Sequence, residues 1–187
     1  MKTIIPDDIR QKALDYYRDV QQRVGGNTPF TVLHIANEYS FIVQGLESDK
    51  PDNLWVFDLG AVKTSHDFFK HVPPTPGEVE YAIMEVEDEV MPLHKLLVPN
   101  TNLYTFDSAV KKTAVLGAVV ETGAAITFER ADMENVFYRL AAIISGRPAS
   151  QDVLPAENTF AASLLILREV MHHLAFKNIT ILTNREN

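Results

Sequence analysis

FTVLHIANEYSFIVQGLESDKPDNLWVFDLGAV (residues 30–62) contains three apolar segments that predict three strands in quick succession. The segments are Phe30–Asn37, Tyr39–Leu46 and Leu54–Val62. The first two are almost contiguous, which forces them into an antiparallel hairpin. The gap at 47–53 is rich in turn-forming residues, so the third strand should also run antiparallel to its neighbour. The stretch therefore predicts a three-stranded meander.

Amphipathic helices dominate the rest of the chain, together with two further strands. We expect the strands at Leu103–Asp107 and Asn178–Thr183. A long helix should begin at Thr75-Pro76-Gly77-Glu78, because this spacing allows a capping box with proline at the first helical position. Its apolar residues continue to Leu97, with a kink expected at Pro92. Further helices are expected at 6–24, 107–120, 132–144 and 158–176, with a loop around Thr122-Gly123, and the last helix should be buried because it is apolar around most of its circumference.

The composition is that of one globular domain. The 187 residues are 46% hydrophobic and 22% charged, which allows a sizeable core. No cysteine is present, so disulfides and thiolate metal sites are excluded. The N-terminus lacks the apolar run of a signal peptide, and no segment has the length and hydrophobicity of a membrane span, so we expect a cytoplasmic protein. The net charge of −8 repels polyanions, and we expect neither nucleic-acid nor membrane binding.

Three segments resemble the second domain of the exopolyphosphatase / guanosine pentaphosphate phosphohydrolase (Ppx/GppA) family. They are IPDDIRQKALDYYRDV (5–20), LWVFDLGAVKTSHDFFKHVPPTP (54–76) and LPAENTFAASLLILREVMHHLAFKNITIL (154–182). The resemblance implies an α/β domain of actin-like ATPase type, with a ribonuclease H-like mixed sheet of about five strands and helices packed on it. It implies a single domain over 1–187. Residues 1–28 would be the helix that hands the chain over from a first domain, 29–64 the meander, and 65–187 alternating helices and strands.

The resemblance places the family's chemistry at two turns that follow strands. The first family loop resembles D-I-G-G-G-S-[ST]-E, in which glycines let backbone N–H groups approach phosphate oxygens. The leading acid and the three glycines are replaced here, and only the serine matches in type; the corresponding residues are His34, Ala36, Asn37, Glu38 and Ser40. The second family loop, G-G-[ST]-A, corresponds to Phe106-Asp107-Ser108-Ala109. An acid expected near the start of the final helix is replaced by Asn158-Thr159-Phe160.

These replacements predict an exopolyphosphatase-related domain that is catalytically inert as an isolated chain. It would act through protein contacts or an altered ligand, with no catalytic residue, no cofactor and no metal. One alternative is half of a polyphosphate or guanosine pentaphosphate phosphohydrolase that needs a separate first domain and Mg²⁺. Another is a repurposed acidic site around His34, Glu38 and Asp107 that binds phosphate or a divalent ion. We expect self-association or a protein partner on the former interdomain face.

Other polar residues have simpler interpretations. Lys111 and Lys112 follow the second loop and could meet an anion at the helix start, but a solvated pair is the favoured interpretation. The acids of the long helix lie opposite its apolar stripe and predict a solvated face; they are Glu80, Glu85, Glu87, Asp88 and Glu89. His172 and His173 end the last helix, where a cation favours the helix dipole, so we expect a capping or surface role. His66 and His71 are five residues apart and would not share a helical face, so we do not expect a metal pair.

Overall fold

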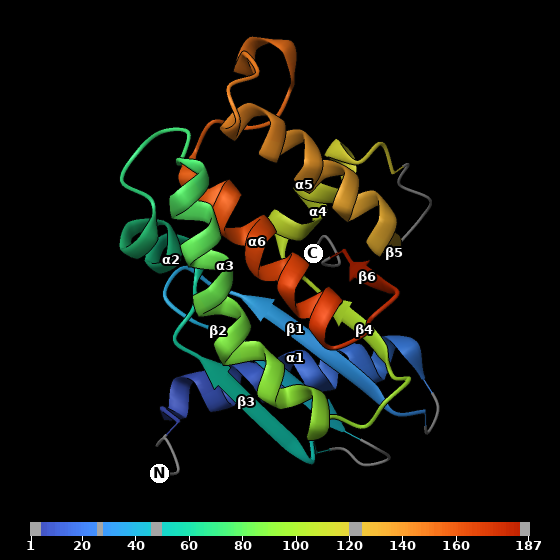
Figure 1. Cartoon of the computed structure of the whole chain (residues 1–187). Coiled ribbons are helices and arrows are strands. Elements are labelled where there is room, and N and C mark those ends of the chain that lie inside the picture. The colour runs from blue at the N-terminus through green and yellow to red at the C-terminus, as the bar shows by residue number, and fades with distance from the viewer. Residues whose placement is uncertain (1–4, 26–27, 46–49, 120–124, 184–187) are drawn as a thin grey trace.

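A computed structural model describes residues 5–25, 28–45, 50–119 and 125–183. Its centre is a six-stranded mixed sheet with helices on both faces (Figure 1). The strands are β1 (Phe30–Ile35), β2 (Ser40–Gly45), β3 (Asn53–Phe57), β4 (Asn102–Thr105), β5 (Ala125–Glu129) and β6 (Asn178–Leu182). The helices are α1 (Asp7–Val24), α2 (Ala61–Phe68), α3 (Pro76–Val90), α4 (Ser108–Leu116), α5 (Arg130–Ile144) and α6 (Asn158–His173), with short 3₁₀ helices η1 (Met91–Lys95) and η2 (Ala149–Gln151).

The strand order is β3-β2-β1-β4-β6-β5, so β1 lies inside the sheet. It pairs antiparallel with β2 and parallel with β4, and Val32 faces Val43 on one side and Tyr104 on the other. β6 runs parallel to β4, and β5 closes the far edge antiparallel to β6. The predicted meander, and the placement of the last strand in the same sheet, are confirmed.

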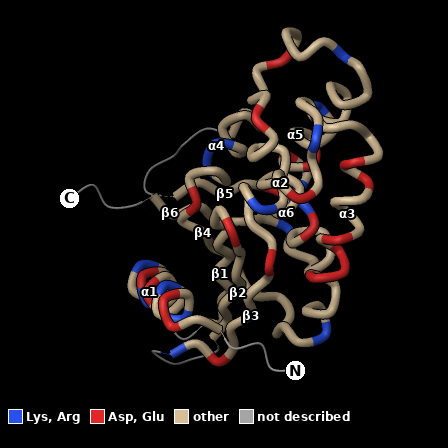
Figure 2. The backbone as a smooth tube through the Cα atoms, turned by 90° about the vertical axis from the view of Figure 1, so that its left-hand side faces the viewer, with Lys and Arg blue, Asp and Glu red and all other residues tan. Residues whose placement is uncertain are grey.

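The helices divide unequally between the two faces of the sheet. Figure 2 shows α1 alone on one face and the other helices on the opposite face. The side chains of β1 alternate accordingly: Phe30 and Val32 pack under α1, whereas Leu33 and Ile35 pack in the larger core around α6. Burial of nearly the whole surface of α6 agrees with its apolar sequence. Helix α1 therefore covers the face of β1 that carries Phe30, Val32 and His34.

Two predicted boundaries differ near prolines and glycines. The third strand ends at Phe57 and not at Val62, and α2 begins at Ala61. Glycine is required at this turn because a Cβ on Gly60 would lie only 2.3 Å from the carbonyl oxygen of Asn37. The kink expected at Pro92 is a full stop of α3, followed by the 3₁₀ helix η1 with proline in its first turn. The capping box at Thr75 and Glu78 is present.

The sheet has one strand more than the expected five. β5 was missed, although its burial alternates along the strand as a period-two pattern predicts. It leads directly into α5, which therefore begins at Arg130 and not at Asp132. Helix α4 ends at Leu116, before the predicted limit. The expected end at Val120, the loop at Thr122-Gly123 and the end of the second strand at Leu46 lie outside the described residues.

The buried carboxylate of Asp152 links helices that lie on the same face of the sheet as α6. Asp152 receives two hydrogen bonds from the Arg139 guanidinium, at 3.1 and 2.5 Å, and a third at 2.7 Å from Arg147. Arg139 also donates to the Leu116 carbonyl at the end of α4. The hydrogen bonds from Arg139 lower the pKa of Asp152 to about 2. One acid therefore joins α4, α5 and the segment around η2.

Among the described residues, the structure contains no helix that is long and apolar enough to cross a membrane.

Candidate functional site

The first site lies where two neighbouring parallel strands end, at the carboxyl ends of β1 and β4. His34 is the fifth residue of β1, and Asp107 follows β4 at the start of α4. Their side chains meet, with the Nδ1 atom of His34 2.5 Å from Oδ1 of Asp107. In open α/β sheets this end of adjacent parallel strands is where ligands are bound. The sequence comparison placed these two residues in separate loops, and the fold brings them together.

Asp107 turns back onto β1 and does not cap its own helix. Its second carboxylate oxygen accepts a hydrogen bond from the backbone N–H of Ile35 at 2.7 Å. Its own backbone N–H donates to the Thr105 hydroxyl, and its side chain makes no cap bond to α4. Both oxygens of the carboxylate are therefore engaged by β1, and the side chain acts as a clamp between the two loops.

Aromatic side chains cover this clamp. Tyr16 of α1 packs edge-on against His34, with ring centroids 4.9 Å apart, and also meets Phe41 and Phe106. Burial, and then the nearby Asp107 carboxylate, raise the pKa of Tyr16 to about 12. Within the described part of the chain, the Nε2 atom of His34 is buried and has no hydrogen-bond partner. Helix α1 therefore covers the His34–Asp107 contact through the Tyr16 ring.

The first loop uses its carbonyl groups to hold the start of α2. The N–H of Ala61 donates to the carbonyl of Ala36, and the N–H groups of Val62 and Lys63 both donate to the carbonyl of Asn37, at 2.8 to 3.0 Å. These donors would otherwise form an anion-binding helix N-terminus. The turn is closed by a bond from the N–H of Ala36 to the carbonyl of Tyr39. This helix N-terminus is therefore not available to a phosphate.

The remaining predicted positions do not converge on the pair. Glu38 is exposed at the tip of the turn. Ser40 is fully buried on the opposite face of the sheet and donates to the Leu59 carbonyl at 2.6 Å. Ser108 is exposed in the first turn of α4. Lys112 is exposed with its ammonium 6.0 Å from the ring centre of Phe160, and Lys111 is half-buried on the same helix. Among the described residues, the group of acids and histidine whose ligand atoms lie close enough to share an ion does not include His34, Glu38 or Asp107.

A second candidate site is a group of ionisable side chains between α3 and α6, which the sequence analysis did not predict. The Nε2 atom of His173 lies 3.0 Å from a carboxylate oxygen of Glu87 and 3.1 Å from one of Glu169. The solvated role expected for Glu87 and the surface role expected for His173 are both wrong, because each lies partly buried in this group. His172 is exposed, as expected. The i, i+4 spacing of Glu169 and His173 was the available signal.

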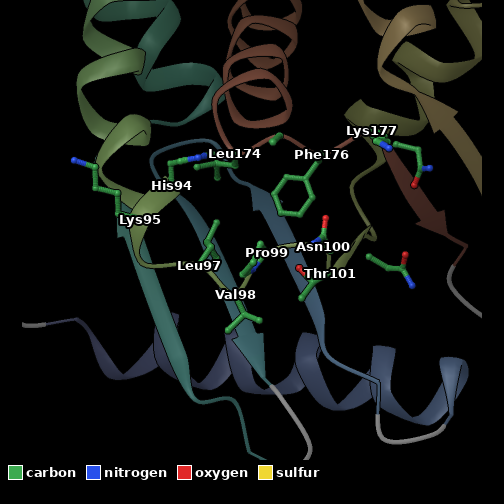
Figure 3. A pocket seen from close by; sticks show the side chains of 13 residues that line it. His94, Lys95, Leu97, Val98, Pro99, Asn100, Thr101, Leu174, Phe176 and Lys177 are labelled. Carbon is green, nitrogen blue, oxygen red and sulfur yellow. The ribbon is translucent and has the colours of Figure 1, made fainter.

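A groove at the amino ends of β4 and β6 is the third feature. Its volume is about 590 Å³, and it lies beneath the last turn of α6, with Phe176 directed toward its middle (Figure 3). His94, Lys95 and Lys177 are among its lining residues, and no carboxylate is. The lining of this groove therefore contains lysines and no acid, whereas the whole chain carries a net charge of −8. It lies at the opposite end of β4 from the His34–Asp107 pair.

Comparisons with known proteins identify the fold. No model of a known protein family matches the sequence, and no curated protein does. The Ppx/GppA phosphatase of Aquifex aeolicus superposes with a TM-score of 0.72 at 16% identity, over 93% of this chain and 59% of that one. An exopolyphosphatase from Cytophaga hutchinsonii gives a TM-score of 0.73 at 13% identity, over 93% and 59%. An exopolyphosphatase-like protein gives 0.68 at 12% identity, over 97% and 62%.

At these identities the likeness establishes the fold, which is the α/β, actin-like ATPase arrangement expected from the sequence. The chain spans about three-fifths of the length of the solved chains that it matches.

Proposed function

We propose that this chain is a Ppx/GppA-related domain that is catalytically inert on its own and acts through protein contacts or an altered ligand. The clamp formed by Asp107 is the observation that carries the proposal. The backbone N–H of Ile35 and the ring of His34 both face this carboxylate at 2.5 to 2.7 Å. Phosphoryl transfer needs free donors or cations around the phosphoryl oxygens, and here an acid takes their place.

Electrostatics oppose phosphate binding at this place. Two unit negative charges 5 Å apart repel by about 3 kcal/mol at an effective dielectric constant near 20. A phosphate at the ends of β1 and β4 would meet the Asp107 carboxylate at such a distance, under the Tyr16 ring that covers it. The chain's charge of −8 adds a weaker, long-range repulsion.

The test is phosphate release from long-chain polyphosphate and from guanosine pentaphosphate in the presence of Mg²⁺. We expect no release above buffer by the purified chain, while an active exopolyphosphatase assayed alongside releases phosphate. Glu38→Ala and Asp107→Asn variants, each checked for folding by circular dichroism, complete the set. Release by the unmodified chain that is lost in either variant would show these acids to be catalytic and would overturn the proposal.

Restoring the family's glycines should not rescue turnover. The triple change Ala36→Gly, Asn37→Gly, Glu38→Gly alters side chains but leaves in place the carbonyls that bind the start of α2 and the Asp107 clamp. We expect no phosphate release, and a loss of stability of about 1–3 kcal/mol from the added freedom of the unfolded chain. Turnover by this variant would show that the loop side chains alone block the reaction.

A half-enzyme is the second candidate, favoured by the three-fifths coverage of the matched phosphatases. In that case Mg²⁺ and catalytic groups would come from a separate first domain across the cleft. Mixing the chain with a separately produced Ppx/GppA first domain in the same assay distinguishes the two. Release by the mixture, but by neither component alone, favours the half-enzyme.

For protein contacts, we propose a second copy of this chain on the face that holds the start of α1 and the edge strand β3. A groove of about 920 Å³ lies there, with Ile9, Trp55 and Leu93 among its apolar lining and Arg10 and Glu89 providing opposite charges. β3 pairs only with β2 within the described sheet, so its other edge is open to a further strand. Sedimentation velocity at micromolar concentration should show a dimer that Trp55→Glu dissociates. A strict monomer would contradict the dimer.

For an altered ligand, we propose a small anionic molecule in the 590 Å³ groove below α6. This volume is in the range of small-molecule sites, and the groove has cationic but no acidic lining residues. Thermal melts against a panel of phosphorylated and carboxylated metabolites test the idea, with Lys177→Glu as the matched variant. A stabilising compound that acts equally on both proteins would place its site elsewhere.

A further inference from the structure

We propose that Glu87, Glu169 and His173 bind a divalent transition-metal ion, with zinc as the best-fitting ion, and that this ion joins α3 to α6. The three side chains each offer one ligand atom, and these atoms all lie within 4.8 Å of one another. The site is separate from the phosphate-loop positions and does not depend on whether they are functional.

The geometry is close to that of a protein zinc site. Ligands of tetrahedral zinc lie 2.0–2.2 Å from the ion, which places ligand atoms about 3.3 Å from one another. The imidazole Nε2 of His173 already lies 3.0 Å from an oxygen of Glu87 and 3.1 Å from an oxygen of Glu169. Small rotations of the carboxylates therefore suffice to admit an ion between the three atoms.

The two helices present these ligands on rigid backbone. Glu169 and His173 are four residues apart, so they lie one above the other on the same face of α6. Two ligands at this spacing on one helix form a recurrent zinc-binding arrangement. Glu87 comes from α3, which runs beside α6 in Figure 1. Sites of this kind, with ligands from facing helices, are typical of metal centres in helix bundles.

Neighbouring groups already orient the ligands. Arg168 donates to one oxygen of Glu169 at 2.5 Å, which leaves the other oxygen directed at His173. Arg168 itself is fixed by Glu134 and by the ring of Phe137 beneath its guanidinium. The backbone carbonyl of His173 accepts a hydrogen bond from Nδ1 of His94, which holds the end of α6 to η1. Such outer partners set ligand orientation in metal sites.

Charge balance is an independent observation that points to a cation. Glu169 has no exposed surface, and Glu87 and Glu134 are partly buried near it. Arg168 is the guanidinium shared by Glu134 and Glu169, so the three carboxylates of the group face one permanently cationic side chain. The Nε2 atom of His173 faces one carboxylate oxygen of Glu87 and one of Glu169, although a single N–H can donate fully to only one of them. A dication would neutralise the group, and buried charges require such pairing.

Zinc fits this ligand set better than magnesium. Imidazole nitrogen suits zinc and other late first-row ions, whereas magnesium requires oxygen ligands in octahedral geometry. One nitrogen and two carboxylates leave at least one position for water. We therefore expect zinc and cobalt to bind, and magnesium at the same concentration to have no effect.

The experiment uses the untagged, metal-stripped full chain. Calorimetric titration with zinc chloride should give one site per chain, and zinc at a hundredfold excess over Kd should raise Tm by about 5–10 °C. Glu87→Gln and His173→Gln should each weaken zinc binding by at least about 100-fold, the upper range for losing an outer-shell partner. Cobalt in place of zinc should give visible d–d absorption that both variants lose.

Matched controls lie next to the two variants. His172→Gln removes the exposed neighbouring imidazole, and Asp88→Asn removes the exposed acid beside Glu87. Both should keep the zinc affinity and the Tm shift. Circular dichroism of every protein without metal separates loss of binding from loss of fold. Absence of saturable zinc binding to the folded chain, or equal binding by His173→Gln, would show the group to be an ion-pair network only and would overturn the proposal.

Discussion

Asp107→Ala gives a sharp test of the structural role of the contact between the turns that follow β1 and β4. The substitution removes the acceptor of the Ile35 N–H and the partner of the His34 ring. Both groups lie in the buried interior, where an unsatisfied polar group costs about 1–3 kcal/mol. We therefore expect the free energy of unfolding to fall by about 3–4 kcal/mol, and Tm by about 10 °C for a chain of this size.

Urea unfolding monitored by the fluorescence of Trp55, the single tryptophan, measures the change. Ser108→Ala, at the exposed neighbouring position, should stay within about 0.5 kcal/mol of the unmodified chain. Asp107→Asn should lie between the two, because its amide oxygen still accepts from Ile35 but its NH₂ group faces the His34 ring.

A double-mutant cycle isolates the contact between the two side chains. In a His34→Phe background the ring nitrogen is absent, so Asp107→Ala should cost about 1–3 kcal/mol less than it does in the unmodified chain. Catalytic and binding residues commonly have the opposite behaviour, in that their replacement is neutral or stabilising. A free energy of unfolding for Asp107→Ala within about 0.5 kcal/mol of the unmodified chain, or strict additivity in the cycle, would refute the structural role.

Three further substitutions test other parts of the structure. Asp152→Asn should lower the free energy of unfolding by about 2 kcal/mol at pH 7, because the folded-state pKa of Asp152, about 2, lies below the ordinary value of 3.8. Urea titrations at several pH values measure this difference between the two proteins. It should vanish as the pH falls from about 4 to 2, where the carboxylate becomes protonated. The pKa of Tyr16 is raised to about 12, so the stability that its protonated form gives the fold is complete below pH 10 and is lost as the pH rises toward 12. Tyr16→Phe has no group that ionises in this window. In alkaline melts its stability should therefore fall by about 2 kcal/mol less than that of the unmodified chain between pH 10 and 12. Gly60→Ala places a Cβ 2.3 Å from the Asn37 carbonyl oxygen and should cost about 2–3 kcal/mol in chemical denaturation, whereas Gly77→Ala, with open space around its Cβ, should be neutral or slightly stabilising.

The sequence predicted the parts of the fold that are set by local pattern. The hairpin at 30–45 follows from two apolar segments with almost no residues between them, and the capping box at Thr75 marks the start of α3 correctly. The boundary at Gly60 failed because its cause is a close approach to Asn37, more than twenty residues earlier. β5 failed because its five residues carry two apolar side chains buried by β6 and α4, which a short window cannot distinguish from a loop.

His34 and Asp107 were selected from the sequence, whereas the contact between their side chains depends on the fold. Alignment to the family loops selected His34 and Asp107, yet only the parallel pairing of β1 with β4 brings the two side chains into contact. The direction of the Asp107 side chain, back to β1 and away from its own helix, has no local sequence signal. The group at Glu87 and His173 was not predicted because its members are 86 residues apart, and only the packing of α3 on α6 joins them.

The clamp also sets how strongly an anion is excluded from the carboxyl ends of β1 and β4. A phosphate that used the Ile35 N–H and the His34 ring as donors would first have to displace Asp107 from both. Hydrogen bonds to a charged group contribute about 1.5–3 kcal/mol each, so displacement costs at least about 3 kcal/mol before any repulsion between phosphate and carboxylate is counted. That alone weakens the apparent affinity by about 100-fold, and takes a ligand that would bind with a Kd of about 1 μM to about 0.1 mM. Because the same hydrogen bonds stabilise the fold, the chain is more stable without an anion at this site. A domain that needs bound phosphate to satisfy the backbone N–H groups of its loops would behave in the opposite way.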